Sequence, residues 1–127
     1  MNDFNQIASI AERLREAMVS RGIKQIDLVR MTGITASAIN RYLSGEYEPK
    51  NKKIYEMARA LNVSEQWLMG YDAPMERPQT QKKNDALTDI VVELRTNKDF
   101  LSIVETIYGL DAEKRAGVKQ MLDALLK

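Results

Sequence analysis

Apolar residues recur every three or four positions through most of the chain, and no stretch shows the two-residue alternation of a half-buried strand. The first stripe predicts an amphipathic helix over residues 5–20 that ends before Gly22. It consists of Ile7, Ile10, Ala11, Leu14 and Met18. Later stripes predict helices over residues 25–31 and 36–43. A fourth helix is marked by Ile54, Met57, Ala58 and Leu61, and a short fifth places Trp67 and Leu68 inward. The sequence therefore predicts an all-α fold.

Caps and breaks mark where these helices should begin and end. Gly33 accepts the left-handed conformation that ends a helix, and the Thr35 hydroxyl suits the start of the next one. We expect Asn51 to cap the fourth helix and Ser64 to cap the fifth. Helix, tight turn and helix within residues 25–45 is a helix-turn-helix arrangement, whose second helix is able to enter a DNA major groove.

The same residues resemble a known family, the lambda-type phage repressors, Cro proteins and their bacterial (XRE-like) relatives. The resemblance covers about residues 5–71 and departs from the family pattern at Lys24, where Ser or Thr is usual, and at Val29, where Ala is usual. It is carried by Gln25, Leu28-Val29, Gly33-Ile34-Thr35, Ile39, Arg41-Tyr42, Gly45, Pro49, Ala58 to Ser64, and Trp67-Leu68. It implies a five-helix, repressor-type DNA-binding domain.

Beyond this domain the pattern changes twice. Residues 72–84 are polar, contain two prolines and lack periodicity, so we expect an exposed linker. Three further stripes then predict helices, the second starting at Asn97 or Asp99 and ending at Gly109, and the third capped by Asp111. The stripe residues are Leu87, Ile90, Val91, Leu94, Phe100, Ile103, Val104, Ile107, Val118, Met121, Leu122 and Leu125.

The expected organisation is a DNA-binding domain at 1–71, a linker at 72–84 and a small helical oligomerisation or partner-binding domain at 85–127. Domains this short rarely cover three apolar faces alone. The last helices therefore either dock on the N-terminal domain or pair with another copy. We favour a homodimer or higher oligomer, because the linker separates the two halves.

Charge is unevenly distributed although the net charge is only +1. Residues 24–53 contain six basic and three acidic residues, whereas residues 73–127 contain nine of each. Positive charge therefore concentrates around the helix-turn-helix, where a phosphate backbone would lie.

The resemblance and the side-chain chemistry together assign the DNA contacts. Asn suits adenine and Arg suits guanine, while Ser can bond base edges and Ala can pack on a thymine methyl group. The expected base-reading residues are Ala36, Ser37, Asn40 and Arg41. The expected phosphate contacts are Gln25, Ser44, Tyr47, Lys50, Asn51, Lys52 and Lys53.

The predicted function is a transcriptional repressor that binds a palindromic double-stranded DNA operator, with an antirepressor protein as a further expected partner. The alternative is an antitoxin-like autoregulator whose helical tail binds a partner protein. The chain has no His and no Cys, so we expect no enzyme, no cofactor and no metal site. With no apolar run of about 20 residues and no signal-peptide pattern, we expect a cytoplasmic protein that contacts no membrane.

Overall fold

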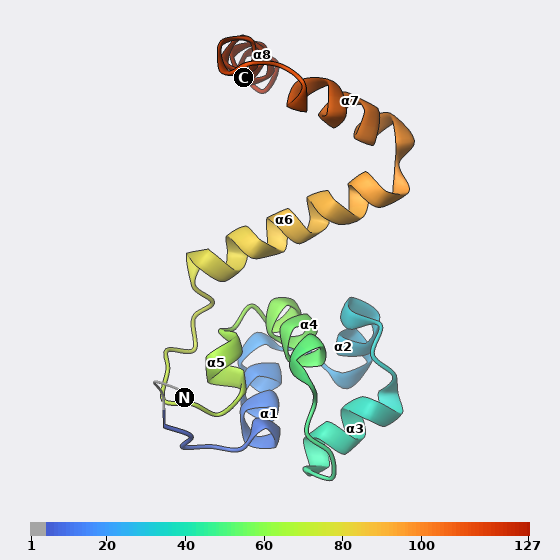
Figure 1. Ribbon diagram of the computed structural model, residues 1–127. Coiled ribbons are helices and arrows are strands. Elements are labelled where there is room, and N and C mark those ends of the chain that lie inside the picture. Colours follow the sequence, from blue (N-terminus) through green and yellow to red (C-terminus); the bar gives the residue numbers. More distant parts are fainter. Residues whose placement is uncertain (1–4) are drawn as a thin grey trace. The chain divides into compact units, whose positions relative to one another are not determined.

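The computed structural model describes residues 5–127, and these residues form eight helices and no β-strand (Figure 1). The predicted all-α fold is therefore confirmed. Two isolated β-bridges, Gln6–Tyr71 and Val63–Glu76, are its only extended pairings in this range. The helices are α1 (Ile10–Arg21), α2 (Gln25–Thr32), α3 (Ala36–Ser44), α4 (Asn51–Leu61), α5 (Glu65–Leu68), α6 (Gln79–Thr96), α7 (Lys98–Tyr108) and α8 (Ala112–Leu125).

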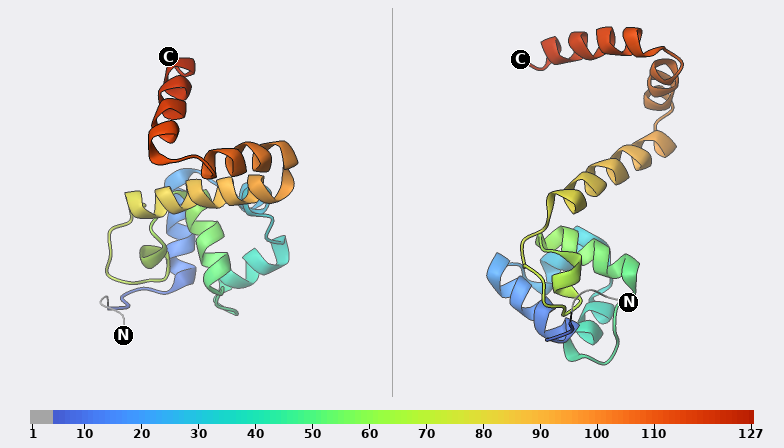
Figure 2. Two further views of the ribbon diagram at one scale, coloured as in Figure 1. Left: turned by 45° about the horizontal axis from the view of Figure 1, so that its top comes forward. Right: turned by 60° about the vertical axis from the view of Figure 1, so that its left-hand side comes forward.

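The chain divides into two units, one through Lys83 and one over Asn84–Lys127. In the first unit, α1 to α5 gather into one body, which Figure 2 shows from two further sides. Residues 1–4 of the predicted 1–71 domain lie outside the described residues, and the division at 71 and 84 stays a prediction.

The start of α1 differs from the predicted helix over 5–20. Ser9 has an extended backbone, and its hydroxyl accepts a hydrogen bond from Glu12 N at 3.1 Å, so the helix begins at Ile10. The preceding residues turn away to the Gly70 carbonyl, which accepts from Ile7 N at 2.8 Å. Ile7 is 61% exposed, so its expected place on the buried stripe is wrong. The predicted end of this helix is confirmed by Gly22, which has a φ of 64°.

Most of the predicted caps are confirmed. Thr35, Ser64, Asn97 and Asp111 each accept a backbone hydrogen bond at the N-terminus of α3, α5, α7 and α8, respectively. Asn51 does not cap α4 as expected, because it is the first helical residue and Lys50 occupies the cap position without a side-chain bond.

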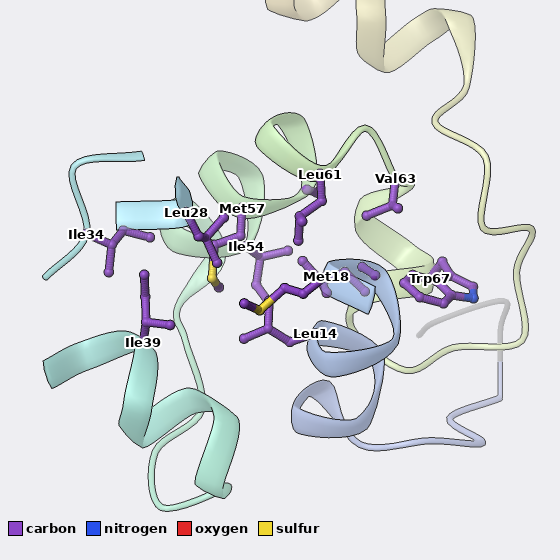
Figure 3. Packing of buried hydrophobic residues seen from close by; sticks show 13 residues of the cluster. Leu14, Met18, Leu28, Ile34, Ile39, Ile54, Met57, Leu61, Val63 and Trp67 are labelled. Carbon is purple, nitrogen blue, oxygen red and sulfur yellow. The ribbon is translucent and has the colours of Figure 1, made fainter. Parts of the chain in front are cut away.

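One apolar core holds the first unit together, and every helix from α1 to α5 contributes to it (Figure 3). Its largest fully buried side chains are Leu14, Leu28, Ile39, Ile54, Met57, Leu61, Leu68 and Val63. Burying such side chains stabilises the fold by about 1.5–3 kcal/mol each before chain entropy is counted. The core therefore fixes α2 and α3 on a common scaffold.

Residues 72–84 are predicted to be an exposed linker, but the structure buries Arg77 within this segment. This side chain is only 2% exposed and donates from Nη1 to Val63 O at 3.1 Å and to Gln81 Oε1 at 3.0 Å. It also pairs with Glu65 at 3.7 Å. Gln81, in the first turn of α6, accepts from Glu65 N at 3.1 Å. The start of α6 therefore belongs to the first unit. Polar contacts hold it there, and a hydrophobic pattern in the sequence cannot predict such contacts.

The second unit has no buried residue: every side chain over 84–127 is exposed or half-buried. Its helices α7 and α8 carry the predicted caps and their apolar stripes, yet α6, α7 and α8 do not pack along one another. None of the helices within residues 5–127 combines the length and the apolar character that a membrane crossing requires.

Candidate nucleic-acid interface

The turn between α2 and α3 is built from four short-range hydrogen bonds. Gly33 takes a φ of 74° and donates its N–H to Val29 O at 2.8 Å, which ends α2. The Thr32 hydroxyl donates to Leu28 O at 2.6 Å and accepts from Ile34 N at 3.1 Å. Thr35 then accepts from Ala38 N at 3.1 Å and starts α3. These bonds set the direction in which α3 leaves the turn.

Apolar contacts fix which face of α3 points outward. Ile39 is fully buried, and Ile34 in the turn is 2% exposed, so both hold the inner side of the helix against Leu28 of α2 (Figure 3). Residues on the other side are left to solvent. All four expected base-reading residues are exposed, namely Ala36, Ser37, Asn40 and Arg41. Their role in reading bases stays a prediction.

Arg41 is held against the ring of Tyr47. Its guanidinium carbon lies 5.2 Å from the ring centroid, and Tyr47 N donates to Arg41 O at 3.3 Å. A guanidinium over an aromatic face is attracted by the ring quadrupole and loses some of its conformational freedom. Tyr47, expected only as a phosphate contact, therefore also orients the arginine that is expected to read bases.

Ser44 makes a local contact of a different kind. Its hydroxyl donates to Arg41 O at 3.0 Å and accepts from Glu46 N at 3.3 Å. Because a serine hydroxyl has a single proton, Ser44 uses its donor within the loop after α3. Its expected contact with a phosphate stays a prediction.

A basic hollow lies between α3 and the start of α4. Four of its residues are positively charged and one, Glu48, is negatively charged. The hollow is lined by Ala38, Arg41, Tyr42, Tyr47, Glu48, Lys50, Lys52 and Lys53. Lys50 and Lys52 are exposed, and Lys53 pairs with Glu56 at 3.7 Å. The structure thus brings most of the expected phosphate contacts next to Arg41, and Asn51 is exposed within the same turn of α4.

Gln25 lies apart from this hollow, at the first position of α2. It is exposed and lines a second hollow with Arg15 and Leu43. The side chain of Lys24 does not cap α2, as expected for a lysine at this position. Its backbone N–H nevertheless donates to Asp27 Oδ2 at 3.0 Å, so an acidic side chain satisfies one of the free amides. A phosphate at Gln25 would therefore meet fewer free donors than the sequence suggests.

The family model for helix-turn-helix proteins matches residues 14–68, from the core of α1 through α5. Within this segment, α2, the turn and α3 have the helix-turn-helix arrangement. The chain is 39% identical over 70 residues to the HTH-type transcriptional regulator PrtR of Pseudomonas aeruginosa. That match covers 54% of this chain and 27% of PrtR, so the chain spans about a quarter of the length of its relative.

The solved structures that match this chain include a repressor and a transcriptional regulator. The P22 c2 repressor in complex with a synthetic operator is 27% identical with a TM-score of 0.46, and the match covers 49% of this chain and 94% of that chain. A transcriptional regulator from Listeria innocua is 22% identical with a TM-score of 0.47, and that match covers 82% of this chain and 99% of the other.

Sequence reasoning missed one residue that supports the helix-turn-helix domain from outside its motif. Arg15 of α1 donates from Nη2 to Leu43 O at 2.9 Å, near the C-terminus of α3. A cation there also complements the negative end of the helix. The two residues are 28 positions apart, so no local pattern links them.

Thr35→Ala should destabilise the helix-turn-helix domain by about 1 kcal/mol, because α3 loses the side chain that caps it. Chemical denaturation of the full chain measures this change. Thr80→Ala, at an exposed position near the start of α6, is the matched control and should stay within about 0.5 kcal/mol of the parent. Equal effects of both substitutions would remove the capping role of Thr35.

Proposed function

We propose that the chain is a sequence-specific, double-stranded DNA-binding transcriptional repressor that acts as a dimer or higher oligomer on a palindromic operator. One observation carries the DNA-binding part. The outer side of α3 presents Ser37, Asn40 and Arg41 to solvent, and the basic hollow lies directly beside it. Repression rather than activation rests on the resemblance of residues 5–71 to the phage repressors.

In this proposal α3 enters the major groove and its outward side chains select the sequence. Asn40 bonds adenine through a paired donor and acceptor, and Arg41 bonds O6 and N7 of guanine. Ser37 bonds a base edge, and Ala36 packs on a thymine methyl group. The stacking of Arg41 on Tyr47 reduces the entropy lost when the guanidinium is ordered on a base.

The basic hollow positions the protein on the sugar–phosphate backbone. Lys50, Lys52 and Lys53 contribute charge, while Tyr47 and Asn51 offer hydrogen-bond donors at the same edge. Gln25 contacts a second phosphate at the start of α2. These contacts hold α3 in register and do not depend on sequence.

Lys52→Ala should weaken binding to every DNA sequence alike and lower the slope of log affinity against log salt concentration by about one unit. Lys52 is suited to this test because it is exposed and lines the basic hollow. Titration of a labelled duplex at several salt concentrations measures the slope. An unchanged slope would place Lys52 outside the interface.

Self-association through the stripes of residues 84–127 would complete the proposal. A two-fold dimer places two reading helices on successive turns of one duplex, about 34 Å apart. The observation that favours it is the lack of any buried residue in this unit. An operator read this way has two inverted half-sites.

Selection of bound fragments from random duplex DNA by the full chain tests the function. The expected result is an enriched sequence with two inverted half-sites about one helical turn apart. Retention of random DNA without any enriched sequence would contradict sequence-specific recognition. Enrichment of a single, unpaired site would contradict binding as a dimer but not sequence-specific recognition.

The second candidate is an antitoxin-like autoregulator whose tail binds another protein. The same helices favour it, because their exposed apolar faces could be covered either by a second copy of the chain or by a different protein. The purified chain separates the two cases. A self-associating tail would be helical and unfold cooperatively, whereas an antitoxin tail alone would be poorly folded.

For a repressor we propose that release from DNA involves either a second protein, an antirepressor in the cytoplasm, or a change in oligomerisation. Co-purification with the full chain tests for such a partner. A binding protein that lowers operator affinity in titration would support the proposal, and one that leaves it unchanged would not be an antirepressor.

A further inference from the structure

The connection between α6 and α7 is too short for these two helices to form an ordinary hairpin. A single residue, Asn97, separates α6 from α7, whereas antiparallel helices are normally joined by two to five residues. Asn97 is bonded on both sides: its Nδ2 donates to Glu93 Oε1 at 3.0 Å and its Oδ1 accepts from Phe100 N at 3.0 Å. The apolar stripes of α6 and α7 therefore cannot fold face to face within one chain.

The junction of α7 with α8 is also fixed. Arg115 donates from Nε to Ile107 O at 3.1 Å, its Nη2 bonds Tyr108 O, and its guanidinium lies 5.6 Å from the Tyr108 ring. These contacts tie the first turn of α8 to the end of α7. They leave Leu122 and Leu125 46% and 80% exposed.

Charge differs between the two parts of this unit. Residues 84–108 contain five acidic and two basic residues, whereas residues 112–127 contain four basic and two acidic ones. Some of these charges border the apolar stripes: Glu93 follows Ile90 by three positions, and Asp99 precedes Ile103 by four. On α8, Lys114 precedes Val118 by four positions, and Lys119 precedes Leu122 by three. By the same spacing Arg95 borders Val91 and Arg115 borders Val118, so the edges on α6 and α7 carry two acidic residues and one basic residue, and the edge on α8 carries three basic residues. The two sets of edges are therefore opposite in net charge.

We infer that residues 84–127 form an exchanged dimer, in which α8 of each chain packs on the α6–α7 stripes of a second copy of this chain. In this arrangement each stripe is covered by a helix of the other chain. No hairpin between α6 and α7, which Asn97 prevents, is needed. It also places Lys114 and Lys119 beside acidic residues of the other chain, although Lys119 already bonds Asp123 in its own helix. This inference deepens the self-association in the proposed function and does not depend on how DNA is read.

Two charge-reversed variants of the full chain test the exchange, with sedimentation measured in the absence of DNA. One carries Glu93→Lys and Asp99→Lys, and the other carries Lys114→Glu and Lys119→Glu. Each alone places like charges across both halves of the dimer, so its dimer dissociation constant should rise at least about tenfold. An equimolar mixture should restore dimerisation, because each α8 then meets a complementary partner.

Glu105→Lys is the control, since this residue lies two positions from Ile103 and Ile107 and so points away from the stripe of α7. It should leave dimerisation unchanged. Circular dichroism of each variant measures its helix content, and restoration by mixing would itself show that the weakened variants are not simply unfolded.

Three results would overturn the exchange. A parent chain that sediments as a monomer would show that the stripes are covered by its own first unit or by another protein. Weakened variants that mixing does not restore would show that α8 packs within its own chain. Variants that associate like the parent would show that these charges do not lie at the interface.

Discussion

Arg41→Ala should weaken binding to the preferred operator by about 1–3 kcal/mol, roughly 5- to 150-fold, while binding to random duplex DNA changes far less. Arg41 is exposed on the outer side of α3, and its guanidinium is oriented by Tyr47. A guanine contact made through two hydrogen bonds disappears completely when the side chain is truncated. The ratio of the two affinities, measured at one salt concentration, is the quantity that tests base reading.

Arg30→Ala is the matched control for Arg41→Ala. Arg30 is exposed on α2, and its loss removes the same unit of positive charge from the same segment. It should lower both affinities slightly and leave their ratio unchanged. Equal losses on operator and random DNA for Arg41→Ala would make Arg41 a backbone contact only. In that case Asn40 and Ser37 would remain the candidates for base reading.

The helix-turn-helix could be predicted from the sequence because its determinants are local. Gly33 ends α2 by its own backbone conformation, and Thr35 caps α3 through an amide three residues away. Ile39 lies on the apolar side of a short helix, so the exposure of Asn40 and Arg41 follows from the helical period. Interactions within four residues of each other are visible in a sequence.

What the sequence did not reveal depends on contacts between distant segments. Ile7 has helical spacing to Ile10, but the carbonyl of Gly70 draws the preceding backbone out of the helix. Arg77 lies in a polar, proline-containing stretch that resembles a linker, yet it satisfies the buried carbonyl of Val63. Hydrophobic periodicity carries no signal for a buried polar network, because the side chains in it are those usually found in solvent.

In the candidate site, too, local features could be predicted from the sequence and contacts between distant segments could not. The outward residues of α3 and the lysines after it could be assigned from spacing and charge. The stacking of Arg41 on Tyr47 and the bond from Arg15 to Leu43 could not, since both depend on how the loop after α3 and the helix α1 approach it. These two contacts attach the C-terminal part of α3 to the loop that follows it and to α1.

Truncation after Lys83 should yield a monomeric domain whose operator affinity is lower by about 10²- to 10⁴-fold, because the second reading helix no longer binds as part of the same complex. The cut keeps Gln81, whose side chain accepts from Arg77 and Glu65 N. The shortened chain retains the whole core of the first unit. Sedimentation and DNA titration measure the two effects separately.

A cut after Pro78 is the informative comparison, because it removes Gln81 and leaves Arg77 with one acceptor fewer in a buried position. That chain should also be monomeric but less stable than the one ending at Lys83, by about 1–3 kcal/mol in denaturant unfolding. Equal stability of the two would show that the start of α6 contributes nothing to the first unit. A chain ending at Lys83 that still sediments as a dimer would place self-association in the helix-turn-helix domain, and the stripes of α6 to α8 would then serve another partner.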